Sequence, residues 1–248
     1  MIVLLEPQYS RDTLWASPTL GIFMNIKSFL LIVSMLWSSG CITLGSVQRA
    51  DTLGEGNWQV GIEPGVWGAA LESDGAAVLG AFTVSGRFGV TDRFDIGGRF
   101  GTNVYEITTK YQFTDPESTG PVLSLAPSFS VFARGGAGAG FAFGHINVPL
   151  LIGLPVGKHQ FIIGPRIIDV FMGAGGGGTG GFGNILMVGS SFGFHAAIGK
   201  QFGLLPEFSA VYPITLSGTS GDTSQSISAL DSGLLLFQFQ LGFVLGKQ

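Results

Sequence analysis

Several residue types on which ordinary soluble domains rely are scarce in this chain. One cysteine, Cys41, occurs among 248 residues, which excludes an intrachain disulfide and a zinc site built from clustered thiolates. Charged residues make up 11% of the chain, whereas soluble domains carry roughly 25%. The net charge is −4 and no basic cluster is present, which argues against a nucleic-acid partner. No His-Glu-x-x-His spacing occurs, so the sequence predicts no metal site and no cofactor.

Long hydrophobic runs are missing after Cys41, although the chain as a whole is apolar. A membrane-spanning helix needs ~20 mostly apolar residues, and no such run follows this cysteine. Yet 46% of the residues are hydrophobic and 41 are glycine. A chain this apolar must either be deeply buried or face lipid on strands. Closed barrels satisfy every backbone donor and acceptor in hydrocarbon without helices.

Apolar and polar side chains alternate in three consecutive runs, from Leu79 to Phe88, from Phe94 to Phe100 and from Tyr105 to Phe113. In the second run Phe94, Ile96 and Phe100 share one face, and the charged residues share the other. A period of two with one apolar and one charged face predicts strands that lie between two different solvents.

Six further runs are long for strands of a soluble protein. They exceed the usual 5–6 residues and suit the ~9–11 residues that a spanning strand needs. A soluble β-sandwich also alternates and is the main alternative, but its outer faces meet water, and this chain has too few charges to coat them. We therefore predict an all-β, antiparallel, up-and-down transmembrane β-barrel. The runs are Val122–Arg134, Phe141–Leu154, His159–Phe171, Phe182–Lys200, Phe202–Ser217 and Leu234–Gly246.

The last of these runs resembles the C-terminal strand of bacterial outer-membrane proteins, with Leu235, Phe237 and Phe239 on one face and Gln238 and Gln240 on the other. This resemblance implies a small outer-membrane barrel in contact with outer-membrane lipids. It also implies assembly by the barrel-assembly machinery. We expect the protein to be a monomer.

The segment before the cysteine resembles a bacterial lipoprotein signal peptide. From Met24 the chain opens with a short basic region, continues through the apolar stretch Ser28–Trp37 and reaches Gly40-Cys41. This stretch has the length of a signal h-region and is too short for a spanning helix. We interpret residues 1–40 as a misassigned start plus this signal peptide. The resemblance implies lipidation of Cys41, with an ordinary cleaved signal as the alternative.

The turns divide the rest of the chain into a linker, residues 41–56, and an outer-membrane barrel, residues 57–248. Short polar breaks alternate with longer or glycine-rich ones, as inner turns and outer loops do in such barrels. This alternation predicts ten strands, beginning with Asn57–Gly68, although eight or twelve also fit. Both ends of the barrel then lie on the inner side. The short breaks are Val90–Asp92, Asp115–Gly120, Pro155–Lys158 and Gly199–Gln201, and the longer ones begin near Leu71, Gly101, Gly135, Gly173 and Gly218.

Charged residues on three consecutive strands form the principal candidate site. Their positions place most of them on the polar face, where they can pair across the lumen, and Arg166 and Glu207 can extend the arrangement. The interior of a barrel of about eight strands is only just filled by side chains. The charges therefore either plug the lumen or set the selectivity of a narrow polar pathway. The set is Arg87, Arg93, Asp95, Arg99, Glu106 and Lys110.

Candidates for catalysis are few. His145, His159 and His195 are the available general bases, and Ser191 lies near His195. Four residues along one strand is roughly 13 Å, too far for the hydrogen bond of a nucleophile–base pair. The glycine-rich run 173–183 lacks the lysine of a phosphate-binding loop and is interpreted as an external loop.

Aromatic residues near the predicted strand ends form the last pattern. Such rings settle at the two membrane interfaces. The residues are Trp58, Trp67, Phe82, Phe88, Tyr105, Tyr111, Phe113 and Tyr212.

Together these features predict a non-enzymatic outer-membrane lipoprotein, either structural or a narrow channel for small solutes. A membrane-embedded lipid-modifying enzyme and a scaffold that binds partners through its loops are the alternatives. Fold alone does not decide among them.

Overall fold

The computed structural model describes residues 43–71, 75–101, 104–136, 139–176, 179–220, 223–229 and 233–246. The predicted signal peptide and Cys41 lie outside these residues. Within them, the chain forms twelve β-strands. They are β1 (Trp58–Leu71), β2 (Gly75–Thr91), β3 (Phe94–Gly101), β4 (Val104–Gln112), β5 (Val122–Leu125), β6 (Ser128–Gly136), β7 (Ala139–Val156), β8 (His159–Gly176), β9 (Thr179–Ala197), β10 (Phe202–Ser220), β11 (Thr223–Ser228) and β12 (Leu234–Gly246).

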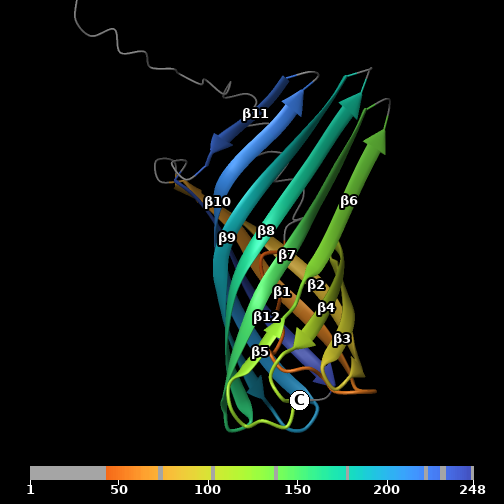
Figure 1. Cartoon of the computed structure of the whole chain (residues 1–248), viewed down its shortest axis with the longest axis vertical. Helices are drawn as coiled ribbons and strands as arrows, with labels where there is room; N and C mark the ends of the chain where they lie inside the picture. Colours follow the sequence, from red (N-terminus) through yellow and green to blue (C-terminus); the bar gives the residue numbers. More distant parts are fainter. Residues whose placement is uncertain are drawn as a thin grey trace, which may run out of the picture. The chain divides into compact units, whose positions relative to one another are not determined.

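The strands close into an antiparallel barrel of ten strand positions, which confirms the predicted fold (Figure 1). From β1 to β4 and from β7 to β10 each strand pairs with the next in sequence, and β1 pairs with β12, which in turn pairs with β10. Strands β5 and β6 share one position, between β4 and β7. The break between them falls at Pro127, which has no N–H to donate to the ladder. Strand β11 only extends β10 as a hairpin.

The two ends of the barrel differ in how far the strands extend. The predicted short breaks at 90–92, 155–158 and 199–201 coincide with tight turns, and both Gln59 and Gly246 lie at that end, where they pair. At the other end strands β7 to β10 run 18 or 19 residues each and rise beyond β3 and β4 (Figure 1). We call the first end the short-turn end.

Apolar side chains face outward and polar ones inward. Ile107, Phe100 and Phe192 are 63%, 60% and 59% exposed, whereas Arg99 and Lys110 are 1% and 2% exposed. In a two-layer sandwich the apolar residues would be the hidden ones, so that alternative is wrong. The outer surface suits hydrocarbon, and the inner surface suits water or polar groups.

No helix among the described residues is long and apolar enough to cross a membrane.

Trp67 does not belong to the predicted outer aromatic girdles. It is 5% exposed and packs inside the barrel with Leu44, Phe143 and Ile168. The position is fixed by the alternation of β1, in which the odd-numbered residues Gln59 and Glu63 also point inward. The other seven predicted girdle residues are exposed: Trp58, Phe82, Phe88, Tyr105, Tyr111, Phe113 and Tyr212.

Candidate functional site in the lumen

Residues 43–53, which we call the lumen segment, lie inside the barrel. The sequence predicted residues 41–56 only as a linker and gave no reason to place them there. Thr43, Leu44, Ser46 and Val47 are all at most 7% exposed. None of the described strand pairings includes this segment, so side chains of the barrel wall hold it.

The wall binds the backbone of the lumen segment from many directions. Backbone N–H groups donate to Gln238, Glu207, Gln160, Gln112 and Asp95, and backbone carbonyls accept from Arg166, Arg99, Arg87, Ser124 and Lys110. Arg87 of β2 and Arg166 of β8 reach it from opposite walls, because these strands stand five positions apart in the ring of ten. The lumen segment therefore spans the interior.

Glu207 and Arg87 clamp the middle of the segment. The two carboxylate oxygens of Glu207 accept the N–H groups of Ser46 and Val47, each at 2.8 Å. Arg87 donates through Nη2 to the carbonyls of the same two residues, at 3.1 and 3.0 Å. The backbone N–H and C=O groups of both residues are thereby satisfied in a buried setting, where an unpaired group costs about 1–3 kcal/mol.

Arg99 is the centre of a charge network that lies farther from the short-turn end than the pair of Lys110 and Asp95. Its Nη2 lies 2.5 Å from Glu63 Oε2, and its Nη1 lies 3.5 Å from Glu106 Oε1 and donates to the carbonyl of Gly45 at 2.9 Å. Thr43 donates to Glu106 at 2.6 Å. Charges this deeply buried are stable only when paired and hydrogen-bonded, and the lumen segment supplies part of that bonding.

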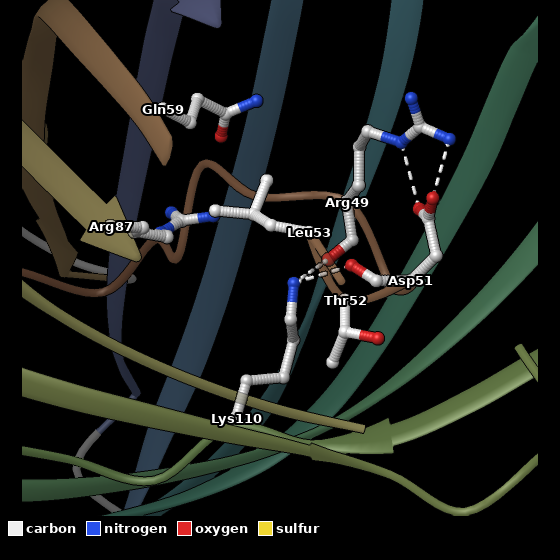
Figure 2. A pocket seen from close by; sticks show the side chains of 7 residues that line it. All are labelled: Arg49, Asp51, Thr52, Leu53, Gln59, Arg87 and Lys110. Atoms are coloured by element: carbon white, nitrogen blue, oxygen red, sulfur yellow. Dashed lines mark hydrogen bonds and ion pairs between the residues drawn. The ribbon is translucent and has the colours of Figure 1, made fainter. Parts of the chain in front are cut away.

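Lys110 and Asp95 form a second pair nearer the short-turn end, at 3.1 Å. Lys110 donates to the carbonyl of Asp51 at 2.5 Å, and Asp95 accepts the N–H of Leu53 at 3.1 Å. Figure 2 shows Lys110 pointing toward the lumen segment, beside the ion pair between Arg49 and Asp51. The cavity here measures about 40 Å³, room for a few water molecules.

Five of the six predicted charged residues meet inside the barrel. Arg87, Asp95, Arg99, Glu106 and Lys110 are all buried. The predicted extension by Arg166 and Glu207 is also present, with 3.5 Å between Nη2 and Oε1.

Arg93 is the exception, because it is exposed in the turn between β2 and β3. The sequence placed it inside because Arg93 continues the alternation of β3, but the strand begins only at Phe94. Glu63 was missed, although it occupies an inward position of β1. It accepts hydrogen bonds from Thr83 at 2.9 Å and Ser85 at 2.5 Å.

The lumen also contains a serine–histidine contact that the sequence did not predict. Ser191 accepts a hydrogen bond from Arg166 and is thereby tied to the charge network. Instead, Ser130 Oγ lies 2.6 Å from His145 Nδ1, and His145 Nε2 lies 3.7 Å from Glu106. These three residues sit side by side on β4, β6 and β7. Only the strand register reveals their proximity.

Metal ligation finds no support in the described part of the chain, where no group of three or more His, Cys, Asp or Glu side chains could hold an ion.

Comparisons with known proteins show likeness in structure only. No protein-family model and no curated protein matches the sequence. Among solved structures, the chain is similar to Neisserial surface protein A, with 13% identity over 76% of this chain and 96% of that one, at a TM-score of 0.41. It is similar to the outer membrane protease OmpT of Escherichia coli, with 7% identity over 77% and 96%, at a TM-score of 0.43. It is also similar to the attachment invasion locus protein Ail of Yersinia pestis, with 9% identity over 77% and 99%, at a TM-score of 0.38.

Proposed function

We propose that this protein is a non-enzymatic outer-membrane barrel whose lumen is closed by its own residues 43–53. The observation that carries the proposal is the double clamp on Ser46 and Val47 by Glu207 and Arg87. An open pathway would need this backbone elsewhere. The structural role that the sequence predicted is therefore favoured over a channel that is permanently open.

Two features support location in a bacterial outer membrane. The outer surface of the barrel is apolar, and its long strands are joined by short turns at one end. Aromatic side chains such as Trp58 and Tyr105, 57% and 61% exposed, suit the membrane interfaces. The lipoprotein-like signal from Met24 supplies the export route that this location requires.

Lipidation of Cys41 is the finer part of the proposal, and geometry limits it. Leu53 binds Asp95 near the short-turn end. Thr43 instead binds Glu106, which stands opposite Arg99 in the strand register. Arg99 lies four residues farther along β3 than Asp95, a distance of roughly 13 Å. Cys41 can lie at most ~7 Å from Thr43. An acyl chain inserted in the membrane leaflet at the short-turn end would thus require the segment to leave the lumen. We propose that lipidation at that leaflet and lumen occupancy are alternative states.

Planar-bilayer conductance tests the closure. The intact protein is expected to give no steady current, and the double variant Arg87→Ala/Glu207→Ala to give transient steps because the clamp is lost. Steady steps from the intact protein that change with Arg99→Ala would instead support the narrow channel for small solutes.

One contact favours the alternative of a lipid-modifying enzyme. Ser130 Oγ lies 2.6 Å from His145 Nδ1. Both side chains are almost fully buried in the lumen, away from the lipid that such an enzyme must reach. Acyl analysis of lipids incubated with the protein tests it: turnover that disappears in Ser130→Ala would establish the enzyme.

A loop-mediated binding scaffold is the other alternative, for which the β10–β11 hairpin offers a surface.

A further inference from the structure

We propose that the lumen is a binding site for a peptide with aliphatic side chains three residues apart, and that it can exchange its own lumen segment for such a peptide. This inference rests on the proposed function in one respect, the presence of residues 43–53 in the lumen of the folded protein.

The wall recognises peptide backbone rather than one particular set of polar side chains. Its contacts to Leu44, Gly45, Ser46, Val47 and Ala50 run to N–H and C=O groups that every peptide carries. Hydrogen bonds to charged groups such as Glu207 contribute about 1.5–3 kcal/mol each. Another peptide that turns in the same way at the position of Val47 could therefore take the same bonds.

Aliphatic spacing supplies the selectivity. Leu44, Val47, Ala50 and Leu53 are 0%, 1%, 0% and 6% exposed, and they recur every third residue although the chain turns at Val47, whose φ is +37°. Leu44 packs in the cluster around Trp67. Val47 and Ala50 pack in a second cluster that contains Leu151, Ile162 and Leu205.

Glycines in the wall are placed to admit these side chains. A Cβ at Gly242 would lie 2.4 Å from Val47 Cγ1, and one at Gly153 would lie 2.7 Å from the Cβ of Ala50. On the peptide side, a Cβ at Gly45 would lie 2.5 Å from Gln240 Oε1. A side chain directly after the first aliphatic residue would therefore have to displace the Gln240 amide.

The barrel is closed without the segment, which favours exchange. Its ten strand positions pair with one another all the way round, so withdrawal of the segment breaks no ladder bond. The segment leaves the lumen through Gly54 and Gly56, with φ of +76° and +73°, on either side of exposed Glu55. Once the lumen is open, water can solvate the groups that the segment released.

The test converts the segment from a tethered to a free ligand. A protease site is inserted after Glu55 in the full chain, the folded protein is cut, and a fluorescent synthetic peptide of residues 43–53 is exchanged in and followed by anisotropy. Cutting is needed because a short tether holds a cis ligand at an effective concentration in the millimolar range.

Three altered peptides decide what the site recognises. A peptide with Ser46, Gln48, Arg49, Asp51 and Thr52 shuffled is expected to bind within about tenfold of the native one. A peptide of the same composition with its aliphatic residues made adjacent should bind roughly 100-fold more weakly. N-methylation at positions 46 and 47 removes two bonds to Glu207 and should weaken binding by at least roughly 100-fold.

A wall variant gives an independent check. Gly242→Val fills the space of Val47 and is expected to weaken the native peptide at least tenfold. Gly86→Val is the matched control, because nothing lies within 4 Å of a Cβ at Gly86. Circular dichroism verifies that both variants fold.

The proposal would be overturned by any one of three results. These are that no peptide exchanges into the lumen, that all peptides bind equally, or that only the native sequence binds. The proposed closure fails separately, if the uncut protein conducts steadily. If the uncut protein shows no conductance and the cut protein exchanges no peptide, only this inference is lost and the proposed closure stands.

Discussion

Arg99 and Glu63 form an ion pair in the lumen, with Nη2 and Oε2 2.5 Å apart and side chains 1% and 0% exposed. They stand on β3 and β1, and Ser85 and Thr83 of the intervening β2 donate to the same carboxylate. Three neighbouring strands are thereby tied together on the inner side of the wall.

Removal of one partner of this pair should destabilise the barrel strongly. Breaking a buried pair costs about 3–5 kcal/mol because it leaves a buried charge uncompensated. We expect Glu63→Ala to lower the free energy of unfolding by this amount in urea titrations of the lipid-embedded protein. Glu63→Ala/Arg99→Met should recover part of the loss, and Glu117→Ala, at an exposed turn, is the control. Equal effects of Glu63→Ala and Glu117→Ala would contradict the pair.

Arg87 and Arg93 should behave differently, although both have the same charge and lie six residues apart. Arg87→Gln removes bonds to the lumen segment and should allow brief conductance steps. Arg93→Gln changes an exposed turn, and surface changes alter stability by about 0.5 kcal/mol or less; it should stay silent. Bilayer recordings of the two variants make the comparison, and steps from Arg93→Gln alone would contradict the assignment of these residues.

Trp58 and Trp67 should respond oppositely to brominated lipids, which quench rings that face the bilayer. Trp58 is 57% exposed on the outer surface and Trp67 is 5% exposed inside. With the other tryptophans replaced by phenylalanine, we expect strong quenching of Trp58 and weak quenching of Trp67. Strong quenching of both would contradict the inward position of Trp67, and weak quenching of Trp58 with strong quenching of Trp67 would mean that β1 has the opposite orientation.

Lipidation of Cys41 should correlate with an empty lumen. Metabolic labelling with a fatty acid, compared with Cys41→Ser, measures the modified fraction. If the two states alternate as proposed, conductance should rise with the acylated fraction, and a fully acylated protein that stays silent would contradict the alternation.

Local alternation made most of the barrel predictable. Strand positions and inner turns follow from the period of two, and the inward charges Asp95, Arg99, Glu106 and Lys110 follow from the same parity. The parity does not say where a strand begins, which is why Arg93 was misplaced. Trp67 was assigned by residue type, although the inward parity of β1 applied to it as well.

The lumen segment could not be predicted in this way, because its partners are distant in sequence. Leu44 bonds to Gln238, 194 residues away, and Ser46 bonds to Glu207, 161 residues away. No period of two runs through residues 43–56. The three-residue spacing of Leu44, Val47, Ala50 and Leu53 is a signal that sequence reasoning could have used, but its meaning depends on a lumen to receive it.

Thiol labelling at Ser46 measures whether residues 43–53 lie inside the folded barrel. In a Cys41→Ser background, Ser46→Cys and Glu55→Cys are each exposed to a water-soluble thiol reagent in the folded, membrane-embedded protein. Ser46 is 7% exposed in the lumen, and Glu55 is exposed at the glycine turn. We expect position 46 to be labelled at least roughly 100-fold more slowly than position 55, and urea to abolish the difference. Equal rates in the folded protein would contradict it, because residues 43–53 would then lie outside the barrel.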